Sequence, residues 1–226
     1  KFGRKMAATP ASPFMTTLSR HLQAKEIWVG SDFALGRNRE GDLNRLRELG
    51  QELGYSLHVV EPVSVDGQIV SSSRIRDLLR EGQVEEAGRL LGRCPSLSGK
   101  VVGGAGRGRN LGFPTANLEV LAGRVVPANG VYAVYALLDA DRQPGVANIG
   151  VRPSFDGSAL TPDLRTIEIH LFDFNRNIYG CDLLVEFVAR LRSERRFDDI
   201  HDLIAQIERD SQQARQILAG SACTLP

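Results

Sequence analysis

Hydrophobic residues change their spacing along the chain, and this change divides it into two parts. Up to about residue 93, short apolar runs such as Glu26–Gly30 alternate with stretches such as Leu43–Leu53, whose leucines recur every three or four positions. The first pattern predicts short buried strands and the second predicts helices. Strands that alternate with helices are typical of an α/β domain with a parallel sheet.

The elements expected in this first part are short. Asp42 and Gly54 flank one helix as an N-cap and a C-cap. The predicted strands cover residues 26–30, residues 57–61 and a short run through Ile69 and Val70, and the predicted helices cover residues 13–23, 43–53, about 71–82 and about 84–91.

Beyond Arg93-Cys94-Pro95 the helical spacing gives way to alternation. Several strands joined by hairpin-like links, without helices between them, predict an antiparallel β-barrel. The expected strands cover residues 99–102, 131–138, 145–150, 164–172 and 181–191. Asp198 and Asp199 precede a helical stripe that ends near Gly220, which predicts a C-terminal helix packed on the barrel. We therefore predict an α/β domain over residues 1–93 and a β-barrel domain over residues 94–226.

The composition excludes several classes of protein. Of 226 residues, 42% are hydrophobic and 24% are charged, and the net charge is +1. This balance gives no case for binding nucleic acid or a membrane surface, and no apolar run is long enough to span a bilayer. Three separated cysteines and four scattered histidines lack the spacing of a zinc site. We expect free thiols and a cytoplasmic protein.

A glycine-rich loop is the clearest chemical signal. It carries Gly103, Gly104, Gly106, Arg107 and Gly108 and leads into Pro114-Thr115-Ala116-Asn117. Backbone amides in such a loop can bind an anion, and the arginine adds positive charge. The oxygens of Thr115 and Asn117 suit a magnesium ion that also holds phosphate. A loop of this kind is also common as a simple turn, so the glycines alone leave both interpretations open.

A glutamate stands in a strand that otherwise alternates cleanly. Ile167, Ile169 and Leu171 are expected on the core face, and Thr166, Glu168 and His170 on the other. Glutamate has a low preference for strands. From the residues alone, Glu168 is either an exposed filler or a placed functional group.

The complete run Gly103–Asn117, together with Glu168, resembles the riboflavin kinase family. The resemblance implies that ATP phosphorylates the ribityl 5′-hydroxyl of riboflavin and gives FMN and ADP. It implies that the loop glycines cover the phosphates, that Thr115 and Asn117 hold Mg²⁺, and that Glu168 is the catalytic base. The family also places near its substrates the segments that contain Asn148, Arg192 and Phe197, which we expect to bind flavin.

The first part resembles the later half of the adenylyltransferase module of bacterial FAD synthetases, a Rossmann-like nucleotidyltransferase. Two stretches carry the resemblance, and they include Gly30, Asp32 and Phe33 and then Ser71, Ser72, Ser73 and Arg76. The serines stand at a helix N-terminus, where they can bind phosphate or simply cap the helix. The His-x-Gly-His motif that opens the module does not occur in the sequence. We therefore expect an incomplete adenylyltransferase site and no FAD synthesis by this chain as it stands.

Three alternatives remain open at this point. The chain could be a non-catalytic module that binds flavin or nucleotide, or a full bifunctional enzyme whose N-terminus is only missing from the sequence. A nucleic-acid-binding barrel would need basic strands interleaved with exposed aromatic residues, which the near-neutral charge disfavours. The sequence leaves the oligomeric state unknown.

Overall fold

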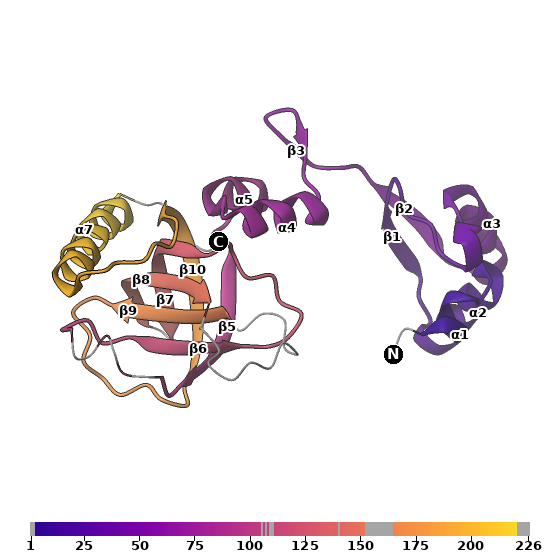
Figure 1. The fold of residues 1–226 in the computed structure, drawn as a ribbon. Helices are drawn as coiled ribbons and strands as arrows, with labels where there is room; N and C mark the ends of the chain where they lie inside the picture. The colour runs from indigo at the N-terminus through magenta and orange to yellow at the C-terminus, as the bar shows by residue number, and fades with distance from the viewer. Residues whose placement is uncertain are drawn as a thin grey trace. The chain divides into compact units, whose positions relative to one another are not determined.

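The computed structural model describes residues 3–104, 106, 108, 111–139, 141–151 and 165–220. It contains two compact units, Lys1–Ile69 and Val70–Pro226, and each is described by itself. Figure 1 shows the elements of both units. The units divide before the predicted boundary at residue 93, because the two helices that precede the barrel pack with it. As a division between sequence modules, the boundary at 93/94 stays a prediction.

The first unit contains two parallel strands covered by helices. Its elements are α1 (Arg4–Ala7), α2 (Ala11–Leu22), β1 (Glu26–Gly30), the 3₁₀-helix η1 (Arg37–Arg39), α3 (Leu43–Leu53), β2 (Ser56–Val60), β3 (Ser64–Val65) and β4 (Gln68–Ile69). Strands β1 and β2 pair in parallel, as the sequence predicts. Met15 of α2 packs with Leu46 and Leu49 of α3 in a shared core. Helix α1 is not among the predicted elements, and its residues Arg, Lys, Met and Ala all favour helix.

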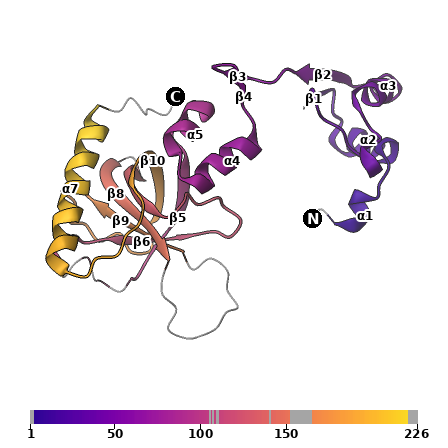
Figure 2. The same ribbon diagram turned by 45° about the horizontal axis from the view of Figure 1, so that its top comes forward.

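The described residues of the second unit form a closed antiparallel barrel together with the helices α4, α5 and α7. Its elements are α4 (Ser72–Glu81), α5 (Val84–Leu91), β5 (Ser96–Val102), β6 (Ala116–Val120), β7 (Gly130–Leu138), β8 (Asp141–Val151), β9 (Arg165–Leu171), β10 (Asp182–Arg192) and α7 (Ile200–Ala219). The strands follow the order β10-β5-β6-β9-β8-β7 around the barrel. Figures 1 and 2 show α7 alongside the strands, outside the barrel. The predicted barrel and C-terminal helix are confirmed.

Alternate residues of the strands fill the barrel. Val101, Val134, Ile149, Ile169 and Val185 are at most 2% exposed and belong to one continuous core. Burial of such side chains is the main favourable contribution to folding. Because successive residues of a strand point to opposite faces, the residues between these lie on the outside of the barrel.

The predicted loop from Asp139 to Pro144 is wrong over most of its length. Strand β8 begins at Asp141, which pairs with Leu138 across the β7–β8 hairpin. Arg142 of this extension stacks on the ring of Tyr135, 3.6 Å from its centroid, and donates to the buried Glu186 at 2.9 and 3.1 Å. Polar side chains therefore cover this end of β7 and β8. Because these residues are polar, the alternation of apolar residues could not predict that β8 begins at Asp141.

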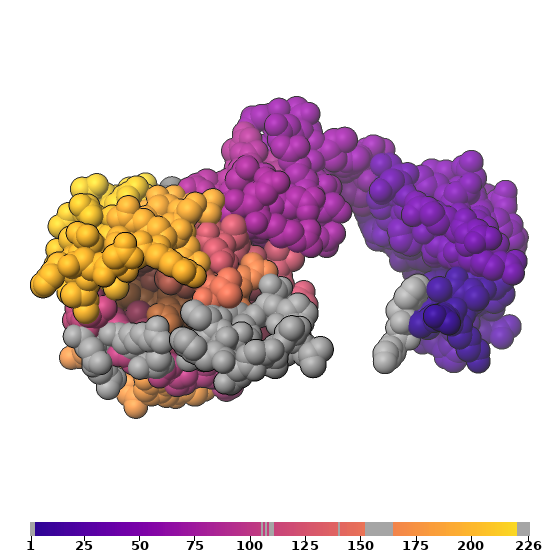
Figure 3. All heavy atoms as spheres, viewed as in Figure 1, coloured from indigo at the N-terminus to yellow at the C-terminus, as the bar shows by residue number. Residues whose placement is uncertain are grey.

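Helix α7 is held on the barrel by apolar contacts and a buried ion pair. Ala214 and Leu218 are buried against β7 and β10 residues. Arg192 at the end of β10 donates to both oxygens of Asp210, at 2.8–3.1 Å, and the two side chains are only 20% and 6% exposed. In the space-filling view the atoms of α7 lie directly against the barrel (Figure 3). Ile200, predicted on the packed face, is instead 55% exposed.

A second ion pair joins α7 to the segment after β9. Arg215 donates to the two carboxylate oxygens of Asp173 at 2.8 and 3.1 Å. The hydrogen bond and the charge of Arg215 lower the pKa of Asp173. Both side chains are largely exposed, so solvent screens this pair more than the buried one.

The cysteines differ from one another. Cys181 is an exposed free thiol, as expected, whereas Cys94 takes part in a disulfide, so the expectation of free thiols is wrong there. Across the described residues, no helix combines the length and the apolar character that crossing a membrane requires.

Replacing Asp210 by Asn should lower the free energy of unfolding of the barrel unit by about 3 kcal/mol or more, because it leaves the guanidinium of Arg192 without its buried counter-charge. Urea unfolding followed by circular dichroism would measure this loss. Asp173→Asn is the matched control, because it removes a carboxylate paired with α7 at the surface, and its effect should be much smaller. Equal losses in the two variants would contradict the importance of the buried pair.

Candidate active site

Three residues singled out from the sequence stand in one row across neighbouring strands. Glu168 of β9 pairs with Asn117 of β6 on one side and with Asn148 of β8 on the other. Directly opposed residues in an antiparallel sheet place their side chains on the same face, about 5 Å apart at Cβ. The neighbours Ile167 and Ile169 are buried in the barrel core. The row therefore lies on the outer face of the barrel, as the alternation of β9 predicts for Glu168.

A cavity of about 250 Å³ lies between this outer face and α7. The barrel contributes Thr115, Asn148 and Glu168, while α7 contributes Leu203, Ile207, Asp210 and Ser211. The remaining lining residues come from the glycine-rich loop, β7 to β10 and the segment before α7: Gly108, Leu111, Phe113, Val131, Val146, His170, Arg192, Glu194, Arg195 and Phe197. We call it the helix-side cavity. It contains all three predicted flavin-binding residues together with the predicted catalytic base.

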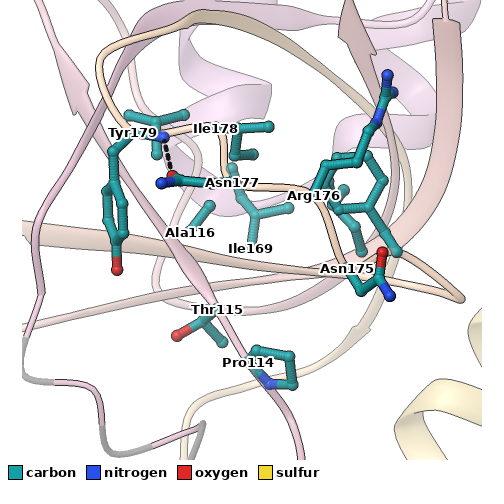
Figure 4. A pocket seen from close by; sticks show the side chains of 12 residues that line it. Pro114, Thr115, Ala116, Ile169, Asn175, Arg176, Asn177, Ile178 and Tyr179 are labelled. Carbon is teal, nitrogen blue, oxygen red and sulfur yellow. Dashed lines mark hydrogen bonds between the residues drawn. The ribbon is translucent and has the colours of Figure 1, made fainter.

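A second cavity, of about 520 Å³, lies on the other side of the Pro-Thr-Ala-Asn segment. Figure 4 shows Pro114, Thr115 and Ala116 along one wall, and Asn175, Arg176, Asn177 and Tyr179 of the β9–β10 loop around the rest. In this loop the amide of Tyr179 donates to Oδ1 of Asn177 at 3.1 Å. We call it the loop-side cavity. Thr115 lines both cavities, so the two meet at this residue.

Two glycines of the loop lie against the two predicted magnesium ligands. A Cβ atom on Gly104 would fall 2.0 Å from Nδ2 of Asn117, and one on Gly108 would fall 2.4 Å from the carbonyl oxygen of Phe113 and 3.3 Å from Oγ1 of Thr115. The carbonyl of Gly108 accepts hydrogen bonds from the amides of Leu111 and Phe113. Only glycine allows backbone to approach these side chains so closely.

The other predicted loop residues are less constrained. A Cβ on Gly103 would meet no described atom within 4 Å, and Gly106 has a positive φ of 69°. Arg107 lies outside the described residues.

His170 connects the Phe-Pro-Thr segment to β9 through a hydrogen bond and a ring contact. Its Nδ1 lies 2.9 Å from the carbonyl oxygen of Pro114, and its ring meets the ring of Phe113 edge to face. Because a carbonyl can only accept, Nδ1 carries the hydrogen. The alternation of β9 predicts only that His170 lies on the outer face, yet this contact helps to hold the segment that carries Thr115.

The side chains predicted to bind flavin differ in how far contacts within the protein already engage them. The guanidinium of Arg192 is engaged by Asp210 and by the carbonyl of Ser193, so it shapes the cavity wall. Phe197 lies beneath Arg195, whose guanidinium carbon is 4.5 Å from the ring centroid. Asn148 stands beside Glu168 in the row across the strands.

The donor set near Thr115 fits a hard cation held jointly with phosphate. Thr115 and Asn117 are two positions apart on an extended segment, so their side chains share a face, and both carry oxygen ligands. Asn117 lies against Gly104 and does not line either cavity. Within the described ranges there is no cluster of three His, Cys, Asp or Glu residues, so phosphate and water would supply most of the ligands.

The residues of the predicted adenylyltransferase site fall in different units. Asp32 and Phe33 line a cavity of about 460 Å³ in the first unit, just after Gly30 ends β1. In the second unit, Ser71 caps α4 by accepting from the amide of Arg74 at 3.3 Å, and Arg76 donates to Oγ of Ser73. The capping interpretation of the serines is thus observed, and phosphate binding by Ser71, Ser72, Ser73 and Arg76 stays a prediction.

Sequence reasoning missed two groups of cavity residues. No site residue was predicted between the strands expected at 164–172 and 181–191, although Asn175, Arg176, Asn177 and Tyr179 form much of the loop-side cavity. Asp210 was overlooked because it interrupts an apolar helical stripe. The position of Asp210 on the packed face of the predicted helix could have identified it, because charged residues are rarely buried without a partner.

Comparison with known proteins identifies two family models that match this chain. The riboflavin kinase family model matches residues 91–218, and the FAD synthetase family model matches residues 1–74. The Bifunctional riboflavin kinase/FMN adenylyltransferase of Escherichia coli strain K12 is 38% identical over 218 residues, 96% of this chain and 68% of the relative. Its counterpart from Bacillus subtilis strain 168 is 37% identical over 215 residues, 95% of this chain and 67% of the relative.

A solved structure is also similar along most of the chain. It is titled as a macrolide-efflux protein from Streptococcus pneumoniae, has a TM-score of 0.84 and 32% sequence identity, and is matched over 95% of this chain and 68% of its own. The riboflavin kinase family model matches the barrel, and the relatives are 37–38% identical along most of the chain. This protein therefore belongs to the class of riboflavin kinases. The chain belongs to the bifunctional riboflavin kinase/FMN adenylyltransferase family.

Replacing Gly104 by Ala should reduce FMN formation on the order of 10- to 100-fold, because the new methyl group displaces the side chain of Asn117 and small misplacements at a reacting site carry such costs. Gly103→Ala is the matched control, since its methyl group meets open space, and it should retain near-normal activity. Steady-state rates at saturating ATP and riboflavin, with thermal unfolding to verify folding, would test the pair. Equal activity in the two variants would contradict the proposed contact.

Proposed function

We propose that the second unit phosphorylates riboflavin with ATP to give FMN and ADP. One observation carries the proposal: Thr115 lines both cavities, and Glu168 lines the helix-side cavity. A hydroxyl group beside Glu168 can therefore meet a phosphate held beside Thr115. Membership of the riboflavin kinase family supports the same reaction.

The loop-side cavity is the proposed nucleotide site. It is the larger of the two, and the polar side chains of Asn175, Arg176, Asn177 and Tyr179 line it together with apolar residues such as Ile169 and Ile178. The glycine-rich loop reaches it at the Pro-Thr-Ala-Asn segment, so that the amides of Gly103, Gly104, Gly106 and Gly108 would face the phosphates. ATP would then place its γ-phosphate at Thr115.

The helix-side cavity is the proposed riboflavin site. Flavin is flat and largely apolar with a polar edge, and such ligands bind in clefts lined by apolar side chains with a few placed polar groups. Phe197, Leu203 and Ile207 supply apolar surface, while Asn148 and Glu168 supply polar groups. The ribityl chain would extend along the row of Asn148 and Glu168 toward Thr115.

The chemistry is a phosphoryl transfer that depends mainly on positioning and on neutralised charge. The ribityl 5′-oxygen attacks the γ-phosphorus, the bond from that phosphorus to the β–γ bridging oxygen breaks, and ADP leaves. Glu168 orients the hydroxyl and accepts its proton. Asn117 and Asn148 flank Glu168 in the row and keep its carboxylate in a polar setting.

Thr115 and Asn117 would hold Mg²⁺. When bound, magnesium neutralises charge on the phosphates. Two protein oxygens are few, but this ion usually keeps several waters and takes phosphate oxygens as further ligands. A reaction that consumes ATP suits the cytoplasm, which we propose as the setting.

Glu168→Gln should lower the turnover number for FMN formation by on the order of 10²-fold or more, because the amide cannot accept the hydroxyl proton. Asn117→Ala should have a comparable effect through loss of charge stabilisation. Purified proteins incubated with riboflavin, ATP and Mg²⁺ and analysed by chromatography would show this.

Near-normal turnover in either variant would refute its assigned role. A wild-type protein that binds riboflavin but forms no FMN would favour a non-catalytic binding module. The same chromatograms report whether FAD is formed.

Variants of the two cavities should separate the two substrates. Phe197→Ala should raise the KM for riboflavin roughly 10-fold or more through lost apolar contact, and should leave the KM for ATP unchanged. Tyr179→Ala should do the reverse, since Tyr179 lines only the loop-side cavity. Steady-state kinetics with each substrate varied in turn would measure both constants. Exchange of the two phenotypes would show that the cavities are wrongly assigned.

A further inference from the structure

Three buried side-chain polar atoms in the described residues have no hydrogen-bond partner. They are Nε2 of His58, Nε of Arg190 and Oγ of Ser211. Only Ser211 lines either of the two cavities described above. A buried hydroxyl without a partner costs free energy, so natural proteins rarely retain one unless something else uses it.

The position of Ser211 is fixed by its neighbour. Asp210 is held by Arg192 through three hydrogen bonds and by Nε2 of Gln206 at 2.7 Å. Both carboxylate oxygens of Asp210 are thus occupied within the protein. Ser211 follows directly on α7 and is one of the residues that line the same cavity, and its buried hydroxyl has no hydrogen-bond partner in the protein. A helical serine often bonds the carbonyl four residues earlier, but no such bond forms here.

We infer that the hydroxyl of Ser211 binds the polar edge of the flavin ring and helps to select the substrate. This inference rests on the proposed riboflavin site. Glu168 and Thr115 enter the cavity from the barrel side and Ser211 enters from α7, so the ring, not the ribityl chain, lies beside Ser211. The ring edge offers an N–H donor and carbonyl acceptors, and a hydroxyl can pair with either.

The hydroxyl would act on binding and not on the chemical step. A contact to the ring is present equally in the bound substrate and in the transition state, so its loss raises KM and leaves the turnover number unchanged. A typical net hydrogen bond corresponds to a roughly 2- to 10-fold change in affinity. Ser211→Ala should therefore raise the KM for riboflavin by that factor and leave the KM for ATP as it is.

Direct binding provides a test that does not depend on catalysis. Lumiflavin carries the same ring without the ribityl chain, and its fluorescence on titration gives a Kd for wild type, Ser211→Ala and Gln212→Ala. Gln212 is the next residue of α7, is exposed and does not line the cavity, so it is the matched control. We expect a 2- to 10-fold weaker Kd for Ser211→Ala alone.

Thermal unfolding without ligand distinguishes recognition from a structural role. Ser211→Ala removes an unpartnered hydroxyl from a helix, so its midpoint should stay the same or rise. An unchanged Kd for lumiflavin in Ser211→Ala, or an equal loss in Gln212→Ala, would overturn the inference, and so would a lowered midpoint that accounts for the loss. If wild type binds lumiflavin with this dependence but forms no FMN, the proposed reaction fails while the inference about Ser211 stands.

Discussion

The register between three neighbouring strands is the constraint on which the site depends. Asn117, Glu168 and Asn148 come from distant parts of the chain, and only the pairing of β6, β9 and β8 brings them into one row. A slip of one residue in β9 would turn Glu168 into the barrel core and bring Ile167 or Ile169 outside. The apolar residues of β9 therefore fix the face that carries Glu168 as firmly as they fix the core.

Helix α7 turns this exposed row into a cavity. Without a covering element, Glu168 would stand on an open face of the barrel, where water would compete for every polar contact. The Arg192–Asp210 pair links the last strand to the helix at the cavity wall, while Ala214 and Leu218 supply the apolar contact. β-Bulges after Phe187 and after Arg190 alter the register of β10 just before Arg192. Such bulges commonly re-aim side chains next to functional sites.

The face on which Glu168 lies and the start of α7 could be predicted from the local sequence, because both follow from short-range patterns. The alternation of Ile167, Ile169 and Leu171 assigns Glu168 to the outer face, and Asp199 marks the start of α7, because both signals act over a few residues. The partners across strands are set by long-range pairing, which no local pattern encodes. For the same reason no local pattern places the β9–β10 loop beside Thr115, and only the closed barrel brings them together.

The glycine-rich loop, first interpreted through its amides alone, has a second physical role. Gly104 and Gly108 leave space that a side chain would occupy, and Asn117 and Thr115 lie in contact with that space. Gly104, Gly108 and the two predicted ligand residues therefore pack together, and the hydrogen bond from His170 to Pro114 links this segment to β9. It follows that phosphate binding and cation binding should not be separable by mutation at these glycines, because a change that lifts the loop also moves the oxygens beneath it.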